Sequence, residues 1–284
     1  MISPGLREEL EKELKTRITS IAPLSAANNA QIYRFVLEGG RSVVAKVAER
    51  GLDTEAYMLN YLKQKSKLPV PGIYYSNEHV IVMEPVESHY SFDAGAIKNA
   101  AEVIAAMHDI HAEQYGLERD TLIGSLRQPN LQSRDWVAFF TEHRLLYMAT
   151  EALNEHKIDA KFMKLVEKLL PKLPGILKDP QPPSLIHGDI WAGNALPTRG
   201  KVAAFLDPAI YYADPEIELA FIRLFNTFDE NFFKRYHELR PIRPGFFEER
   251  ADIYNLYPLL VHTRLFGASY ARKALRILEK FTGK

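Results

Sequence analysis

The sequence contains no cysteine among its 284 residues. This absence excludes disulfides, thiolate zinc sites, iron–sulfur clusters and cysteine nucleophiles, so any metal must bind through Asp, Glu, Asn or His side chains. An excess of one charge is also absent, because 36 Lys and Arg residues balance 36 Asp and Glu residues. A chain with zero net charge does not fit a nucleic-acid binder that works through a basic surface.

Long hydrophobic runs are missing as well. No stretch approaches the roughly 18 apolar residues of a membrane-spanning helix. Residues 1–17 carry acidic side chains throughout, unlike a signal peptide. Hydrophobic residues still make up 46% of the chain, which is enough to fill one large domain or two modest ones. We therefore expect a globular cytoplasmic protein that has neither nucleic-acid nor membrane partners.

The first 86 residues have the pattern of a small β-rich unit. Polar and β-branched or aromatic residues alternate there, and Gly39 and Gly40 supply the positive φ that a tight hairpin needs. Asp53 or Thr54 can cap the one helix inserted between the strands. The pattern predicts a helix over 5–16, strands over 18–24, 31–37 and 42–48, a helix over about 54–65, and strands over 72–75 and 79–86.

Beyond residue 90 the hydrophobic period becomes that of helices. Only residues 184–187, 194–197 and 201–207 interrupt this half with strand character. The sequence therefore predicts an α+β fold of two lobes: a small antiparallel sheet with one helix over residues 1–86, and a larger, mainly helical lobe over 87–284.

The densest cluster of polar residues follows the strand at 184–187. Asn194 opens a predicted hairpin that returns to Asp207, so the two residues should meet at its base. Amide and carboxylate oxygens that converge in this way suit a Mg²⁺ ion that carries phosphates. Asp189, on the same loop, can reach a substrate hydroxyl as a general base. The alternative is a structural loop in which Asp189 caps a turn and Asp207 ends a strand.

A second pair of charges stands at apolar positions of the N-terminal unit. Lys46 lies mid-strand on the face of Val44 and Ala48, and Glu55 lies on the apolar stripe of the following helix. One ion pair between them would satisfy both charges, whereas the alternative is two unrelated snorkelling side chains. A base, an Asn and an Asp in this order, together with a strand Lys and a helix Glu, match the protein-kinase-like phosphotransfer site.

Two further segments belong to this plan. The connector Glu84-Pro85-Val86 follows the last strand of the N-terminal unit, where a kinase joins its two lobes. Residues 25–30 stand where a kinase carries its phosphate loop, yet they contain no glycine. Small residues and Asn still permit backbone N–H groups to approach a phosphate.

With these residues assembled, the chain resembles the fructosamine kinase (ketosamine 3-kinase) family, relatives of the aminoglycoside phosphotransferases. The most specific match is HGDIWAGN at 187–194, because Trp191 separates this family from most aminoglycoside and choline kinases. Residues 207–220 are similar to the family's metal-binding Asp, aromatic pair and acidic helix start, with Glu218 as the acid. Further matches are Asp135-Trp136 with Phe139 and Arg144, PGF at 244–246, and His262 with Phe266-Gly267.

The resemblance implies ATP-dependent phosphorylation of the 3-hydroxyl of a ketoamine, as a free adduct or as a glycated lysine on a protein. It implies Asp189 as the base and Asn194 and Asp207 as Mg²⁺ ligands. It further implies that Lys46, paired with Glu55, contacts the α- and β-phosphates of ATP.

The same resemblance implies that the backbone of Glu84, Pro85 and Val86 holds the adenine and that Trp191 faces the acceptor sugar or its amine. His262 could reach the acceptor pocket, although a role in the core is equally compatible with its position. The phosphate-loop cysteine that gives some members a redox-switched dimer is absent, so no disulfide dimer can form. The oligomeric state stays open.

Other functions remain alternatives to this interpretation. One is a related kinase for an aminoglycoside, choline or homoserine-like acceptor, against which Trp191 argues. Another is a non-catalytic ATP-binding regulator, although Lys46 and all three predicted catalytic-lobe residues are present. A metal hydrolase using His187, Asp189 and Asp207 would leave the Lys46 and Glu55 pattern unexplained. His108 and His111, three residues apart on a predicted helix, suit packing better than a metal site because no third ligand is near.

Overall fold

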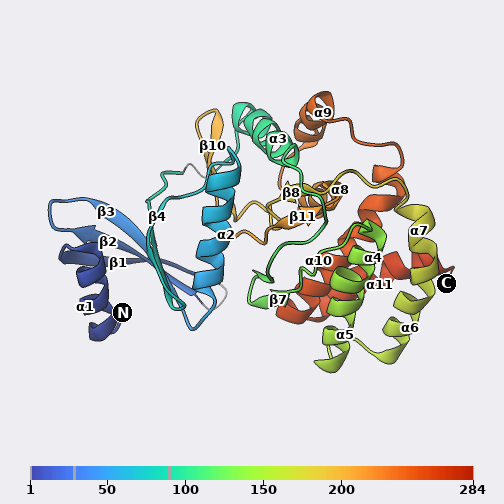
Figure 1. The fold of residues 1–284 in the computed structure, drawn as a ribbon, viewed down its shortest axis with the longest axis horizontal. Coiled ribbons are helices and arrows are strands. Elements are labelled where there is room, and N and C mark those ends of the chain that lie inside the picture. Colours follow the sequence, from blue (N-terminus) through green and yellow to red (C-terminus); the bar gives the residue numbers. More distant parts are fainter. Residues whose placement is uncertain (1, 28–29, 89–90, 284) are drawn as a thin grey trace.

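The computed structural model describes residues 2–27, 30–88 and 91–283. It has two lobes, with the sheet and helices α1 and α2 at one end and most of the helices at the other (Figure 1). No helix in these three ranges is long and apolar enough to cross a membrane. The predicted α+β fold with two unequal lobes is confirmed.

The N-terminal lobe is a five-stranded antiparallel sheet in the order β1-β2-β3-β5-β4. Its elements are α1 (Pro4–Leu14), β1 (Ile18–Ala27), β2 (Ala30–Leu37), β3 (Ser42–Ala48), α2 (Leu52–Lys65), β4 (Ile73–Ser76) and β5 (Val80–Met83). The alternation of β2 and β3 buries Tyr33, Phe35 and Val43 in one cluster with Leu10 of α1. On the opposite face, Ile81 packs with Leu52 of α2.

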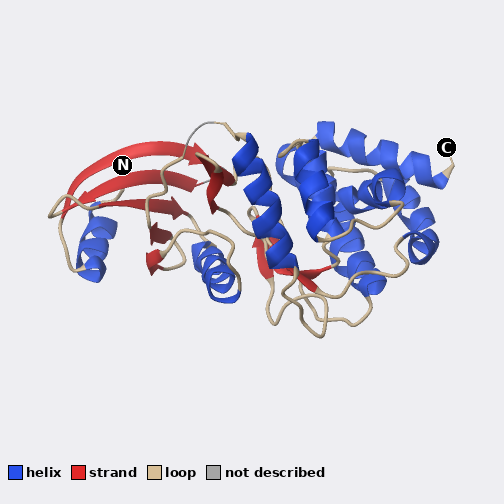
Figure 2. Cartoon of the chain, turned by 90° about the horizontal axis from the view of Figure 1, so that it is seen from above, coloured by secondary structure: helices blue, strands red, loops and turns tan. Residues whose placement is uncertain are grey.

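The C-terminal lobe is mainly helical, and Figure 2 shows its helices stacked beyond the sheet. Its helices are α3 (Ala94–His108), α4 (Trp136–Phe140), α5 (Tyr147–Asn154), α6 (Ala160–Leu169), α7 (Leu173–Ile176), α8 (Glu216–Leu224), α9 (Glu230–Leu239), α10 (Ala251–Phe266) and α11 (Ala268–Thr282). Short two-stranded sheets interrupt them: β6 (Thr121–Ile123) with β7 (Leu126–Gln128), β8 (Ser184–Ile186) with β11 (Tyr211–Ala213), and β9 (Ala195–Thr198) with β10 (Lys201–Phe205).

Several predicted boundaries were wrong. β1 continues to Ala27 and β2 starts at Ala30, so the described part of the expected 25–30 loop is strand, and Asn28 and Asn29 lie outside the described residues. Helix α2 begins earlier than predicted, after Gly51 in the left-handed region, and has no side-chain cap. Strands β6, β7 and β11 were not expected, because three-residue strands are too short to show a period.

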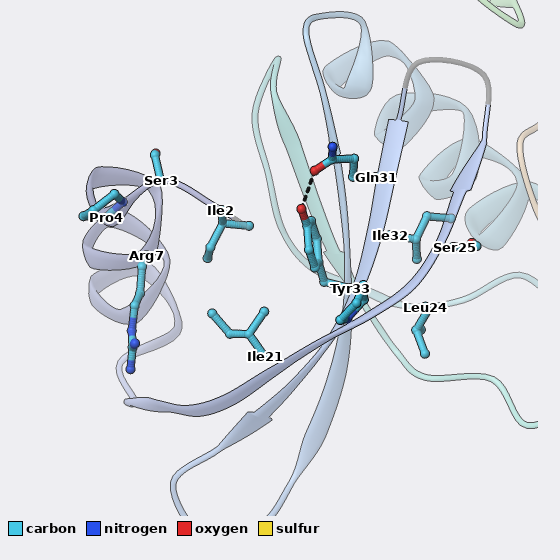
Figure 3. Close-up of a pocket in the computed structure, with 11 residues that line it drawn as sticks. Ile2, Ser3, Pro4, Arg7, Ile21, Leu24, Ser25, Gln31, Ile32 and Tyr33 are labelled. Atoms are coloured by element: carbon cyan, nitrogen blue, oxygen red, sulfur yellow. Dashed lines mark hydrogen bonds between the residues drawn. The ribbon is translucent and has the colours of Figure 1, made fainter.

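One cavity, with a volume of about 780 Å³, lies beside the edge strand β1 and the start of α1 (Figure 3). Its lining includes none of the predicted site residues. Arg7 is the one charged residue among the lining residues, and its guanidinium already binds Glu11 and the carbonyl of Ile18. The predicted chemistry therefore has to be sought elsewhere, between the lobes.

Candidate active site

The ion pair predicted between β3 and α2 is present. Lys46 Nζ lies 2.7 Å from Glu55 Oε2 and 2.9 Å from Oε1. The same ammonium lies 2.7 Å from Asp207 Oδ1, which comes from the C-terminal lobe. Lys46 is thus the point at which the two lobes share one charge cluster.

The electrostatics of this cluster depend on burial. Burial by itself would lower the pKa of Lys46, but the adjacent charges of Glu55 and Asp207 raise it above its ordinary value. Burial together with the neighbouring Asp207 carboxylate raises the pKa of Glu55 to about 7, against the opposing effect of Lys46. Lys46 is therefore a permanent cation, buried where the two lobes meet.

The hairpin β9–β10 brings Asn194 and Asp207 together as predicted. Phe205 pairs with Ala195 at the base of the hairpin, and the N–H of Leu206 donates to the carbonyl of Asn194 over 2.8 Å. Asp207 then turns sharply, with φ of 51°. This left-handed conformation is uncommon for residues other than Gly, although Asp and Asn are enriched in it.

The predicted base sits on the loop that leads into this hairpin. The side-chain amide of Asn194 donates to the carbonyl of Asp189 and to its carboxylate Oδ2, each over 2.9 Å. Burial, followed by the nearby charge of Asp207, raises the pKa of Asp189 to about 8. A raised pKa makes the ionised carboxylate a stronger proton acceptor, which is the property that a general base uses.

A buried chain of polar groups holds the backbone next to Asp189. The N–H of Gly188 donates to Glu218 Oε1 over 2.6 Å, and Glu218 Oε2 lies 2.8 Å from His108 Nε2. His108 Nδ1 in turn lies 2.7 Å from the hydroxyl of Tyr236. Both ring nitrogens of His108 are thus engaged, one with Glu218 and one with Tyr236. The sequence pointed to Glu218 but offered no signal for Tyr236, because it comes from the separate helix α9.

Gly188 and His187 complete this support. Gly188 has φ of 86°, and a Cβ atom there would lie 2.2 Å from the carbonyl oxygen of Ala209, so no other residue fits. The N–H of Asp189 donates to His187 Nδ1 over 3.3 Å. Burial lowers the pKa of His187 to about 4, so its ring is neutral under Asp189.

Trp191 is 42% exposed at the edge of the site. Its ring lies over Gly193, where a Cβ atom would come within 2.3 Å of the ring. Glycine at 193 therefore allows the indole to fold back over its own loop. An aromatic face this exposed is available to a second molecule.

His262 of α10 lies in an aromatic cluster with residues of α10, of α11 and of the C-terminal end of α8. Its ring centroid is 4.7 Å from that of Phe225, 5.3 Å from Phe266 and 4.9 Å from Tyr270. Its Nδ1 lies 2.8 Å from the carbonyl of Pro258. Phe221 connects this cluster to the loop of Asp189, because it lines a small cavity with Gly188 and also approaches the His262 ring.

The connector between the lobes has few free backbone donors. The N–H of Glu84 donates to the carbonyl of Gly72 over 2.8 Å, and its side chain accepts from the N–H of Gly72 over 2.7 Å. Pro85 has no N–H. Within the described ranges, the N–H of Val86 has no hydrogen-bond partner.

The donor atoms at the base of the hairpin suit a hard cation. Asn194 uses its amide nitrogen for Asp189, and within the described residues its Oδ1 and Asp207 Oδ2 accept no hydrogen bond. Among the described residues no three His, Asp or Glu side chains gather as a metal site. Two protein oxygens and a phosphate-bearing ligand are the mode that Mg²⁺ prefers.

Structural comparison identifies the class of fold. The aminoglycoside phosphotransferase APH(4)-Ia superposes over 99% of this chain and 98% of its own with a TM-score of 0.67, at 17% identity. A Thermobifida fusca protein assigned as a fructosamine-3-kinase superposes over the full length of both chains with a TM-score of 0.89, at 27% identity. The chain therefore has the phosphotransferase fold of the protein-kinase-like class.

Sequence comparison then gives the family. The model of the fructosamine kinase family matches residues 6–284. A protein-ribulosamine 3-kinase of rice is 30% identical over 94% of this chain and 80% of its own. A Synechocystis protein assigned as a ketoamine kinase is 39% identical over 62% of this chain, a match that spans 59% of that relative. The chain belongs to the fructosamine kinase family and is a kinase, as its motifs predicted.

Proposed function

We propose that this kinase transfers the γ-phosphoryl group of ATP to the 3-hydroxyl of a ketoamine, as a step in the repair of glycated amines. The observation that carries the proposal is the Lys46 ammonium held between Glu55 and Asp207, facing a loop on which Asn194 orients Asp189. Family membership supplies the substrate class, since relatives are named for ketoamines and ribulosamines.

Phosphoryl transfer asks a protein mainly for positioning and for neutralisation of the charge on the phosphate oxygens. Asp189 accepts the proton of the acceptor hydroxyl, whose oxygen bonds to the γ-phosphorus as the bond to the ADP oxygen breaks. Lys46 neutralises charge on the α- and β-phosphates. Asn194 Oδ1 and Asp207 would hold Mg²⁺, which neutralises phosphate charge when it is bound.

The nucleotide would lie against residues 1–86 and the acceptor against residues 87–284. The free backbone groups of the connector, the carbonyl of Glu84 and the N–H of Val86, would form the two hydrogen bonds to the adenine edge. Pro85 between them cannot donate and keeps this short segment extended.

The acceptor would lie over Trp191. A ketoamine carries a protonated amine next to its sugar carbons, and an exposed indole face attracts such a cation. His262 and its aromatic cluster would form the far wall of the acceptor pocket. Both a free adduct and a glycated lysine side chain fit this proposal, and the cytoplasm remains our predicted location.

The proposal is tested by incubating the protein with Mg-ATP and either ribulosyl-lysine or erythrulosyl-lysine while ADP release and acceptor phosphorylation are followed. We expect turnover with ketoamines and a preference that emerges when a panel of them is ranked by kcat/KM. Phosphorylation of aminoglycosides or choline alone would support the related-kinase alternative. Phosphate release without a phosphorylated acceptor would support a hydrolase, and nucleotide binding without turnover would support a regulator.

A further inference from the structure

Helix α2 carries Glu55, and both lobes bury residues of this helix. Leu52 and Ala56 pack with Ile81 and Met83 of the sheet. Met58 and Leu62 belong instead to the main cluster of the C-terminal lobe, with Tyr57 and Tyr61 packed against it. Figure 1 shows α2 lying between the sheet and the helical lobe. The position of Glu55 therefore depends on the packing of α2 against both lobes.

Two tyrosine hydroxyls on this helix reach across to the C-terminal lobe. Tyr57 donates a hydrogen bond to Glu118 Oε1, and the guanidinium of Arg119 lies 4.6 Å from the Tyr57 ring centroid. Tyr61 donates to the hydroxyl of Tyr212 over 3.2 Å. The Tyr57 and Tyr61 rings lie 5.9 Å apart, so the two contacts form one patch.

The partners of these hydroxyls are connected to the catalytic segment. Tyr212 lies in β11, five residues after Asp207 in the chain. The N–H of Gly116 donates to the carbonyl of Tyr212 over 2.8 Å, and the reverse bond is 2.9 Å, which ties the segment before Glu118 to the same strand. The patch thus joins the helix of Glu55 to the segment of Asp207, and Lys46 bridges these same two carboxylates.

Both hydroxyls stay protonated at neutral pH and can donate. Burial raises the pKa of Tyr57, and the hydrogen bond to Glu118 raises it further. Burial also raises the pKa of Tyr61, and so does its hydrogen bond to Tyr212. The chemistry assumed above for Lys46, Asp189 and the connector uses neither hydroxyl.

We propose that Tyr57 and Tyr61 are positioning residues that fix α2 against the C-terminal lobe, so that Glu55 holds Lys46 in place for the phosphates before nucleotide arrives. Helix α2 is then a fixed element of the site and not one that swings in on activation. The inference rests on the proposed function, because it concerns the placement of the proposed phosphate contact.

The test compares Tyr57→Phe, Tyr61→Phe and the double variant with the matched control Tyr75→Phe. Tyr75 donates to Glu9 Oε1 over 2.8 Å, so this contact joins β4 to α1 without crossing the lobes. The readouts are calorimetric affinity for the non-hydrolysable analogue Mg-AMP-PNP, the KM values for Mg-ATP and for a ketoamine, and the melting temperature.

A hydrogen bond of this kind is worth a factor of roughly 2 to 13 in an equilibrium constant. We expect each single variant to weaken AMP-PNP binding about threefold and the double variant about tenfold. The KM for Mg-ATP should rise in parallel, while the ketoamine KM and the Tyr75→Phe protein stay near wild type. Binding by the folded double variant that matches Tyr75→Phe, even with a lower melting temperature, would overturn the inference and leave only a structural contact.

A double-mutant cycle on Tyr57→Phe and Glu118→Ala gives a second, independent result. If the hydroxyl acts through Glu118, the doubly substituted protein should bind AMP-PNP about as weakly as either single variant. Fully additive losses would contradict the proposed contact. Failure of the wild type itself to bind AMP-PNP or to phosphorylate any ketoamine would instead refute the proposed function, and this inference with it.

Discussion

The proposed nucleotide half and the proposed acceptor half of the site are built differently. The nucleotide half consists of Lys46 locked between two carboxylates, and its charges are satisfied before any ligand binds. In the acceptor half, the indole of Trp191 is 42% exposed, and the aromatic cluster around His262 includes the exposed Phe266. Charge placement defines the first half and shape defines the second.

This difference follows from what each half has to recognise. Phosphates and Mg²⁺ present fixed charges, so a preorganised array of opposite charges stabilises them without rearrangement. A sugar joined to an amine presents hydroxyls and a hydrophobic face, and aromatic surfaces accommodate several such molecules. Substitutions should therefore fall into two groups. Those in the charged half should lower the rate, whereas those in the aromatic half should change the KM for the acceptor.

The largest effect is expected from Asp189→Asn, which removes the base and keeps the shape. Loss of a general base costs about 10²- to 10⁴-fold in rate, so kcat should fall by this factor while the ketoamine KM and the melting temperature stay close to wild type. Steady-state kinetics and thermal unfolding measure both. The control is Asp252→Asn, which alters a carboxylate paired with Lys280 at the surface. Turnover close to wild type in Asp189→Asn would rule out the assignment.

Removing the Lys46 ammonium should impair phosphoryl transfer and nucleotide binding without affecting ketoamine binding. Lys46→Met leaves Glu55 and Asp207 without their common partner, and loss of one preorganised charge contact costs about 10²- to 10³-fold in kcat. Mg-ATP KM should also rise, whereas the affinity for a ketoamine, measured directly by calorimetry, should not change. Lys280→Met, which breaks an exposed pair, is the control. Weakened ketoamine binding in Lys46→Met would show that the halves are coupled.

The neutral support beneath Asp189 predicts a dependence of stability on pH. The pKa of buried His187 falls from 6.5 to about 4 in the folded protein, so the unfolded chain binds more protons between these values. Its contribution, about 3 kcal/mol, is fully present above pH 6.5 and is lost as pH falls to 4. Urea unfolding of wild type and His187→Asn at pH 7.5 and 5 should give a steeper pH dependence for wild type. Equal slopes would mean that His187 is not buried in its neutral form.

The smallest effect should come from the acceptor side. In Gly193→Ala, the added methyl would displace the Trp191 ring, because no space exists between them. We expect a rise of about three- to tenfold in ketoamine KM, in line with about 1 kcal/mol of lost aromatic contact, and unchanged Mg-ATP KM. The control Gly175→Ala meets no atom within 4 Å. A change in Mg-ATP KM of the same size would place Trp191 outside the acceptor half.

The residues that the sequence predicted best are charged residues at positions where the hydrophobic pattern calls for an apolar side chain. Lys46 on an apolar strand face and Glu55 on an apolar helix stripe each required a partner, and the structure pairs them over 2.7 Å. The hairpin between Asn194 and Asp207 followed from two arms of similar length, which fixes where their ends meet. These arguments are local, because period and spacing act over a few residues.

The contacts that the sequence did not indicate all join distant segments. Tyr236 reaches His108 from α9, and Tyr61 reaches Tyr212 across the lobes. A tyrosine in an amphipathic helix looks the same whether its hydroxyl meets water or another element. The short strands β6, β7 and β11 were not predicted for a related reason. A strand of three residues is too short to show an alternating pattern, and it forms because the surrounding fold places it next to its partner.

By itself, the sequence determined the family, the two-lobed fold and the order of the proposed base, the amide and the carboxylate along the chain, because motifs and hydrophobic periods depend only on residues that are near one another in the chain. Only the tertiary structure decided that Lys46 also binds Asp207, that His187 is neutral, and that α2 is held by the opposite lobe. The physical reason is that burial and long-range hydrogen bonds set charge states and positions, and both arise only once distant segments have packed.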